Sequence, residues 1–210
     1  MDDTERPISK YLIKTEECAV GFGIPTSHAE FSVALRDGTS DFVVSHCPVW
    51  EKYRYYVVED IESVLYDLVA WGVGVKRPLE KSGIRELFEK YRVVILFSHW
   101  RNDFIDLIDG PIGVEEFIAR IPDDFGGILD LALCHPQALV KGVRTARPAC
   151  LVKFTQQQAT PAYWIQLYRV LFALVKGGGV TYLDALEMAI AGLREGRVEG
   201  NDGWKRTTDI

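Results

Sequence analysis

The chain has 210 residues, a net charge of −6 and 48% hydrophobic residues, which is enough for one globular domain with its own core. The acidic balance, without a dense run of Lys and Arg, argues against binding to nucleic acid. The first residues, MDDTERPISK, lack the apolar segment of a signal peptide, and no run of 18 apolar residues could cross a membrane. We therefore expect a soluble, cytoplasmic protein.

The first half of the chain gives weak structural signals. Residues 18–24 and 41–47 are predicted as short strands, and 55–58 (YYVV) has the composition of another. Residues 59–71 carry apolar side chains at helical spacing behind an acidic start, which predicts a helix. Residues 83–91 are predicted as a short amphipathic helix.

The second half alternates strands with helices. The run Val93–Phe97 is continuously apolar and begins with β-branched residues, as in a strand that is buried on both faces. Thr160 and Pro161 have the residue types of a helix N-cap and first helical position. The predicted strands are 91–100, 126–136 and 146–155, and the predicted helices are 113–122, 160–178 and 180–196.

This alternation predicts an α/β domain with a mainly parallel sheet and helices on both faces. We expect a single domain over residues 1–196 and a polar C-terminal tail over 197–210.

Two strands of the predicted sheet end in residues that can do chemistry together. One ends at His99, and the next ends at Cys134, 35 residues later. Because function in open parallel sheets collects at the carboxyl ends of strands, neighbouring strands would bring the two side chains to one edge. A thiol becomes a nucleophile when an imidazole removes its proton. The four cysteines form no CxxC pair, so we expect no metal and no cofactor.

These two strand ends also resemble those of a known protein family. The segment VVILFSHW is similar to the strand that ends in the catalytic His of caspase-like proteases, and ILDLALCHP is similar to the next strand, which ends in the nucleophilic Cys. Residues 149–190 resemble the tail of CHAT domains, with Tyr168, Leu171, a glycine turn at 177–179 and an Ala185-Leu186 pair in the family's order. The resemblance covers residues 90–192.

The resemblance implies a caspase-like three-layer sandwich and a cysteine endopeptidase. His99 would be the general base or a charge-stabilising imidazole, and Cys134 the nucleophile that forms a thioester intermediate. The backbone N–H groups of Trp100 and Cys134 would hold the oxyanion. A protein substrate is implied, such as a pore-forming or effector protein encoded nearby in a prokaryotic antiviral defence or cell-death system, together with a sensor or activator protein.

Two alternatives stay open. Trp100 stands where the family has Gly, which favours a catalytically inactive CHAT-like adaptor or regulatory module that binds a partner protein. A flavodoxin-like signalling domain would need acidic residues at the end of the first strand, and 18–24 has none.

Other residues are weaker site candidates. Asp130 would either bind a basic substrate side chain or be a buried structural carboxylate. Gln156 would either line the substrate cleft or lie in an exposed turn. His46 and Cys47 are expected to be structural or to line the cleft rim. The spaced acidic residues Asp103, Asp106 and Asp109 are expected in a solvated loop or acidic rim.

Overall fold

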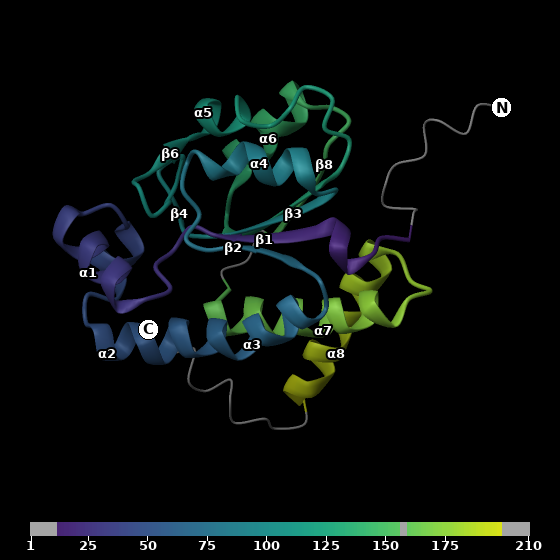
Figure 1. Ribbon diagram of the computed structural model, residues 1–210, viewed down its shortest axis with the longest axis horizontal. Coiled ribbons are helices and arrows are strands. Elements are labelled where there is room, and N and C mark those ends of the chain that lie inside the picture. The colour runs from purple at the N-terminus through teal and green to yellow at the C-terminus, as the bar shows by residue number, and fades with distance from the viewer. Residues whose placement is uncertain (1–11, 156–158, 199–210) are drawn as a thin grey trace.

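The computed structural model describes residues 12–155 and 159–198, with side chains up to residue 193. A five-stranded parallel sheet in the order β2-β1-β3-β7-β8 forms its centre (Figure 1). The strands are β1 Cys18–Phe22, β2 Gly74–Lys76, β3 Val93–Phe97, β7 Ile128–Cys134 and β8 Leu151–Thr155. The predicted α/β class with a parallel sheet is therefore confirmed.

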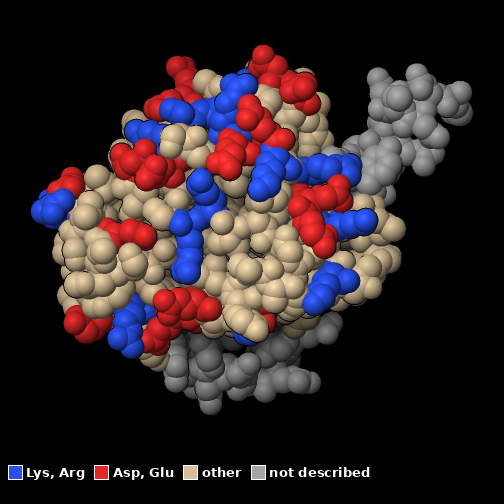
Figure 2. Space-filling view, in the orientation of Figure 1, with Lys and Arg blue, Asp and Glu red and all other residues tan. Residues whose placement is uncertain are grey.

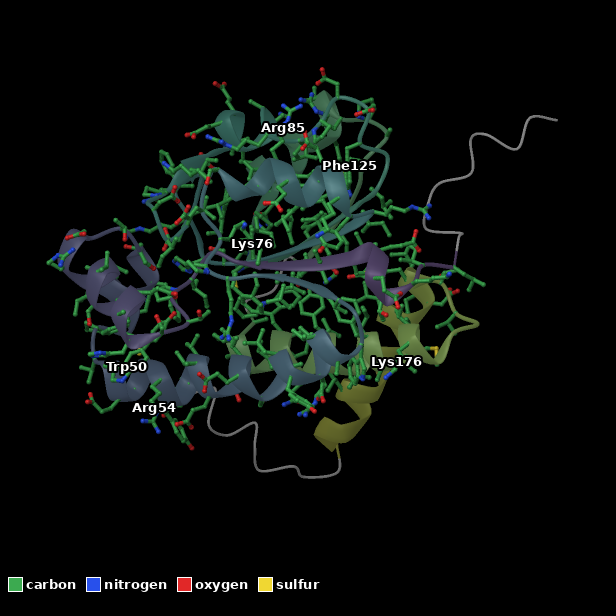
Figure 3. The ribbon with its side chains drawn as sticks, viewed as in Figure 1. Trp50, Arg54, Lys76, Arg85, Phe125 and Lys176 are labelled. Carbon is green, nitrogen blue, oxygen red and sulfur yellow. The ribbon has the colours of Figure 1, made fainter. Side chains whose placement is uncertain are left out.

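Helices cover both faces of this sheet, so that the domain has three layers (Figure 1). One face carries α3 Glu59–Ala70, α7 Pro161–Gly177 and α8 Tyr182–Val198. The other carries α4 Gly83–Lys90, α5 Val114–Ile118 and α6 Gln137–Ala146. Figure 3 shows Lys176 on the first side of the sheet, and Arg85 and Phe125 on the second.

Alternation along the strands divides the core in two. Along β3, Val93, Ile95 and Phe97 pack toward α3 and α7, whereas Val94 and Leu96 pack toward α4 and α5. Successive side chains of a strand point to opposite faces. Because both faces are covered by helices, every residue of β3 is buried, as the continuous apolar run predicts.

A helical segment and a small antiparallel sheet lie beyond the carboxyl ends of the strands. The 3-10 turn η3 Thr15–Glu17 precedes β1, and the segment after β1 contains α1 His28–Asp37, η4 Phe42–His46, α2 Trp50–Tyr53 and η5 Arg54–Val58. The small sheet consists of β4 Trp100–Arg101, β5 Phe104–Ile105 and β6 Ile112–Gly113. The small sheet follows β3 closely in the chain, and residues of η4 lie beside His99, so both border the carboxyl end of β3.

The strands predicted at 41–47 and 55–58 are wrong, because both segments are helical. Residues Phe42–His46 and Arg54–Val58 form π-helical turns, and the second continues directly into α3. Tyr53, Val57 and Ile61 are fully or almost fully buried, which is one face of a continuous helix. The Tyr53 hydroxyl donates a hydrogen bond to the Pro25 carbonyl at 2.7 Å, and this bond ties the helix to the loop after β1.

The elements of the second half agree with their predictions within a few residues. Helix α7 begins at Pro161, and the Thr160 side chain accepts a hydrogen bond from the Tyr163 N–H at 3.3 Å, as expected for an N-cap. The prediction missed α1, α2, α6, the edge strand β2 and the short strands β5 and β6. Residues 199–210 of the predicted tail lie outside the described residues.

Acidic and basic side chains are interspersed on the face shown in Figure 2, without a large patch of one sign. Figure 3 places Trp50 and Arg54 on the helical segment that runs into α3. Among the described residues, no helix has the length and apolar character that crossing a membrane requires.

Candidate functional site

His99 and Cys134 lie at the carboxyl ends of two hydrogen-bonded neighbours in the sheet. Strands β3 and β7 run parallel with Phe97 opposite Ala132. His99 follows the last residue of β3 by two positions, and Cys134 is the last residue of β7, so both lie at the carboxyl end of the sheet. Both residues are partly buried. No hydrogen bond joins the two side chains within the part of the chain that the structure describes; each has a different neighbour.

A tight hairpin fixes the backbone after His99. Asn102 and Asp103 have φ of 48° and 66° and form the two-residue turn between β4 and β5, and these are the positive values of a type I′ hairpin turn. The Asp106 N–H donates to the His99 carbonyl at 3.0 Å. That bond flanks a non-hydrogen-bonded pair, Trp100 opposite Ile105. The Trp100 N–H therefore points away from β5.

The indole of Trp100 is accommodated by the protein core. It is partly buried and packs against the cluster under α4, α5 and α6. The Trp100 indole therefore does not occupy the space beside the His99 imidazole.

Glycine is required where β1 approaches this hairpin. A Cβ on Gly23 would lie 2.6 Å from the Asp106 carbonyl oxygen and 2.7 Å from the Ser98 hydroxyl. The same hydroxyl donates to the Asp106 carbonyl, so the ends of β1 and β3 and the hairpin are in close contact around His99.

The imidazole of His99 lies against residues of η4. Its Nε2 is 3.6 Å from Oδ2 of Asp41. The ring centroid of Phe42 is 5.4 Å away, and that of His46 is 5.5 Å away in an edge-on arrangement. Asp41 and His46 flank one π-helical turn, so this turn forms the wall beside His99.

The two oxygens of Asp41 have different surroundings. Oδ1 accepts a hydrogen bond from the Ser45 hydroxyl at 2.8 Å and forms an ion pair with Arg101. Oδ2 is buried and has no hydrogen-bond partner among the described residues. The Nε2 of His46 lies 3.9 Å from it, beyond hydrogen-bond length. Asp41, His46 and His99 thus bring a carboxylate oxygen and two ring nitrogens within 4.8 Å of one another.

Burial lowers the pKa of His99, and the charge of Asp106 opposes this shift while His46 adds to it. Burial also raises the pKa of Asp106, although hydrogen bonds from the Phe42 N–H at 3.3 Å and the Ser40 hydroxyl at 3.2 Å act in the opposite direction. The lowered pKa favours a neutral His99, which can accept a proton.

Cys134 sits at a sharp turn. Its thiol donates a weak hydrogen bond to the Ala159 carbonyl at 3.6 Å. The next residue, His135, has φ of 55°, in the left-handed region that is unfavourable for residues other than glycine. The Gln137 N–H donates to the His135 carbonyl at 3.0 Å, where α6 begins. The chain therefore turns away directly after Cys134 and leaves this residue at the tip of β7.

The other three cysteines are buried, whereas Cys134 is partly exposed. Burial raises the pKa of Cys150 to about 11, and it also raises the pKa of Cys18 and Cys47. Because the thiolate is the nucleophile, burial makes these three thiols unreactive.

Asp130 has a structural environment. It is completely buried, and its carboxylate accepts hydrogen bonds from the Tyr168 and Tyr182 hydroxyls, both at 2.9 Å. The Lys153 ammonium on β8 lies 3.0 Å from Oδ1 and over the ring of Trp164. This network leaves Asp130 no surface for a substrate. Gln156, the other weak substrate-binding candidate, lies outside the described residues.

The acidic residues after His99 are not a uniformly solvated rim. Asp103 is exposed in the hairpin turn, and Asp109 accepts hydrogen bonds from the Lys81 N–H. Asp106 is buried, which the expectation of a solvated loop did not foresee. His46 is exposed and lies beside His99, and Cys47 is buried.

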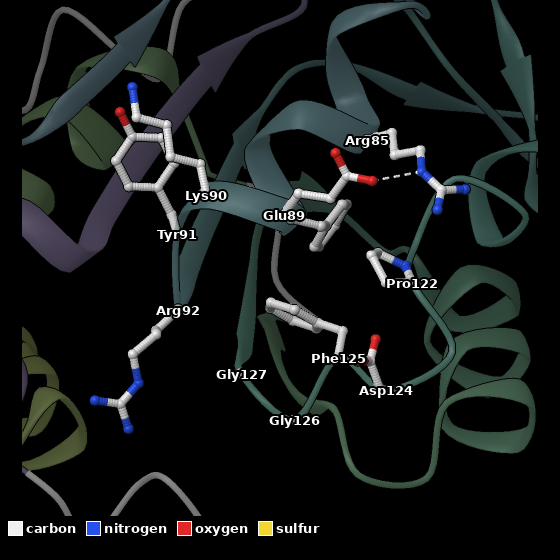
Figure 4. Close-up of a pocket in the computed structure, with 11 residues that line it drawn as sticks. Arg85, Glu89, Lys90, Tyr91, Arg92, Pro122, Asp124, Phe125, Gly126 and Gly127 are labelled. Atoms are coloured by element: carbon white, nitrogen blue, oxygen red, sulfur yellow. Dashed lines mark hydrogen bonds and ion pairs between the residues drawn. The ribbon is translucent and has the colours of Figure 1, made fainter.

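A hollow lies at the opposite end of the sheet, where the strands begin. It has a volume of about 610 Å³ and is lined by residues that precede β3 and β7, among them Tyr91, Arg92 and Gly127 (Figure 4). Phe125 and Glu89 point toward it, and Glu89 pairs with Arg85 at 2.7 Å. Neither His99 nor Cys134 contributes to this hollow.

No protein-family model matches the chain, and no curated protein matches it. His99 and Cys134 are the candidates that the sequence indicates, whereas Asp41, which lies 58 residues before His99, is not among them. The sequence sign that could have indicated Asp41 is its position in one short segment with His46. The prediction of a strand in this segment does not bring the two residues together.

Proposed function

We propose that the protein is a cysteine endopeptidase of the caspase/CHAT type, with His99 as general base and Cys134 as nucleophile. The observation that supports this proposal is that His99 and Cys134 lie at the carboxyl ends of β3 and β7, two strands that pair directly in the sheet. The partial exposure of Cys134, unique among the four cysteines, supports it.

In the proposed reaction, Nδ1 of His99 takes the thiol proton, because Nε2 faces Asp41. The Cys134 sulfur attacks the peptide carbonyl carbon and gives a tetrahedral oxyanion. The C–N bond then breaks, His99 returns the proton to the leaving amine, and a thioester remains. Water, deprotonated by His99, hydrolyses the thioester to a carboxylic acid and restores the thiol. Asp41 is a positioning residue for the imidazole.

Backbone groups are suited to hold the oxyanion. The Trp100 N–H points away from β5, and the Cys134 N–H lies at the strand tip. Losing one such donor generally costs about 2.7–4 kcal/mol of transition-state stabilisation. These two donors are the ones that the resemblance to caspase-like proteases implies.

The parallel sheet with the order β2-β1-β3-β7-β8 and helices on both faces is compatible with a caspase-like three-layer sandwich. With the resemblance of residues 90–192, this supports a cytoplasmic protease that acts on a partner protein in a prokaryotic defence or cell-death system. The second candidate is an inactive adaptor of the same fold, which the Trp100 side chain in place of Gly favours.

Cleavage of a complex peptide mixture separates the two candidates. The protein is incubated with a proteome-derived peptide library, and new peptide ends are identified by mass spectrometry. We expect new ends that share a preferred residue before the cut, and these ends are absent with Cys134→Ala but present with Cys47→Ala. Identical ends with Cys134→Ala would refute the proposed nucleophile.

A further inference from the structure

The Asp41 carboxylate faces two imidazoles with an oxygen that lacks a hydrogen bond. Oδ2 is buried without a partner in the described part of the chain. The ring nitrogens Nε2 of His99 and His46 lie 3.6 Å and 3.9 Å from it. Leaving a buried carboxylate oxygen without a hydrogen bond costs free energy. A bound ion that contacts Oδ2 of Asp41 and the two Nε2 atoms at once would remove this cost.

We propose that Asp41, His46 and His99 form a zinc-binding site, and that zinc bound there reversibly inhibits the protein. Two imidazole nitrogens and one carboxylate oxygen are a donor set that suits Zn²⁺ and not Mg²⁺ or Ca²⁺, which prefer oxygen ligands. The inhibitory part of this proposal rests on the proposed function, since it requires His99 to be the general base.

The separations are close to those of a tetrahedral site. Bonds of about 2.0–2.1 Å place two ligand atoms about 3.3 Å apart around Zn²⁺. The observed separations from Oδ2, 3.6 Å and 3.9 Å, exceed this by tenths of an ångström. Asp41 and His46 flank one helical turn, and His99 follows β3. All three donor atoms lie within 4.8 Å of one another, so closing the site requires rotation of the side chains, and a fourth position is left for solvent.

The far oxygen of Asp41 is already anchored. Ser45 and Arg101 hold Oδ1, which orients Oδ2 toward the two imidazoles, as outer partners orient ligating carboxylates in metal sites. The cation of Arg101 also repels a second cation. This repulsion weakens zinc binding, so that the site suits reversible occupation.

Zinc at Nε2 removes the base from His99. A neutral imidazole carries one proton on its two nitrogens. When Nε2 donates its lone pair to the metal, that proton resides on Nδ1. Nδ1 then cannot accept the proton of Cys134, so the thiol is not activated. The inhibition requires no contact between zinc and sulfur.

Binding is tested with Zn²⁺ alone, by competition with a chromophoric chelator, on the full chain carrying Cys134→Ala. We expect one zinc per chain. His46→Gln should weaken binding at least about 100-fold, because losing an outer partner alone costs about 10–100-fold. His28→Gln is the matched control, since His28 is exposed and lies against Trp50, and it should leave the affinity unchanged.

The ligand assignment is overturned if the chain carrying Cys134→Ala binds no zinc, if its affinity survives the further change His46→Gln, or if its affinity is lost with the further change Cys47→Ala. Inhibition is measured on the chain with Cys134 intact. It is expressed as the ratio of peptidase activity with Zn²⁺ to that without Zn²⁺, so that changes in basal activity cancel. We expect this inhibition to disappear with His46→Gln and to persist with His28→Gln. Zinc binding that depends on His46 in a protein without peptidase activity would retain the metal site and refute the proposed function; zinc binding without any loss of peptidase activity would refute the inhibition.

Discussion

The substitution Asp130→Asn tests how the buried network holds the sheet to its helices. Asn has nearly the same shape as Asp, so the change removes the charge without creating a cavity. The Lys153 side chain is only 14% exposed, and its ammonium lies 3.0 Å from Oδ1. Without the carboxylate, this cation remains buried and unpaired beside the hydroxyls of Tyr168 and Tyr182.

Removing one partner of a buried ion pair typically costs about 3–5 kcal/mol. We expect the free energy of unfolding of Asp130→Asn to fall by that amount, measured by urea denaturation with circular dichroism. Asp103→Asn is the matched control, because Asp103 is exposed in a turn that Asn tolerates, and its effect should lie within about 0.5 kcal/mol.

A double substitution isolates the ion pair. Adding Lys153→Met to Asp130→Asn removes the unpaired positive charge. The double variant should therefore lose about 1–3 kcal/mol less stability than the sum of the losses of the two single variants. Additive effects, or a loss below about 1 kcal/mol for Asp130→Asn alone, would refute the account of Asp130 as a charged structural centre.

Three further predictions concern the site and its surroundings. In the native protein, Cys150 should react with a disulfide reagent at least about tenfold more slowly than free cysteine at pH 7.5, because burial raises its pKa to about 11 against about 8.5 for a free thiol, and the loss of thiolate outweighs the greater nucleophilicity of a more basic thiolate; an equal rate measured by absorbance would contradict its burial. Asp41→Asn should lower kcat about tenfold with little change in KM and in the urea midpoint, since Asp41 orients His99 (general acid–base catalysis contributes about 10²–10⁴-fold in total); an altered KM alone would refute this role. Thr160→Ala should destabilise the protein by about 1 kcal/mol in urea denaturation through the loss of the α7 cap, and an unchanged stability would show that the cap contributes nothing.

The sequence predicts those parts of the fold that local signals determine. The apolar run of β3 identifies a strand buried on both faces, and Thr160 with Pro161 marks the start of α7. The ends of β3 and β7 locate His99 and Cys134, because the topology of parallel sheets brings neighbouring strand ends together.

The parts that sequence reasoning missed depend on long-range packing. The segments around Val43 and Val57 contain β-branched residues and read as strands, but burial against other elements makes them helical. The spacing of Tyr53, Val57 and Ile61 was the available sign of a helix. Asp41 reaches His99 only because η4 folds over the end of β3, and no local pattern encodes that approach.

Covalent capture tests the catalytic pair most directly. The full chain is treated with a set of peptide chloromethylketones that have acidic or basic residues at the reactive end, and the modified residue is mapped by mass spectrometry. We expect modification of Cys134 alone, at a rate that falls at least about 100-fold with His99→Gln and is unchanged with His28→Gln. Modification spread over several cysteines, or a rate at Cys134 that does not depend on His99, would contradict the proposed catalytic pair.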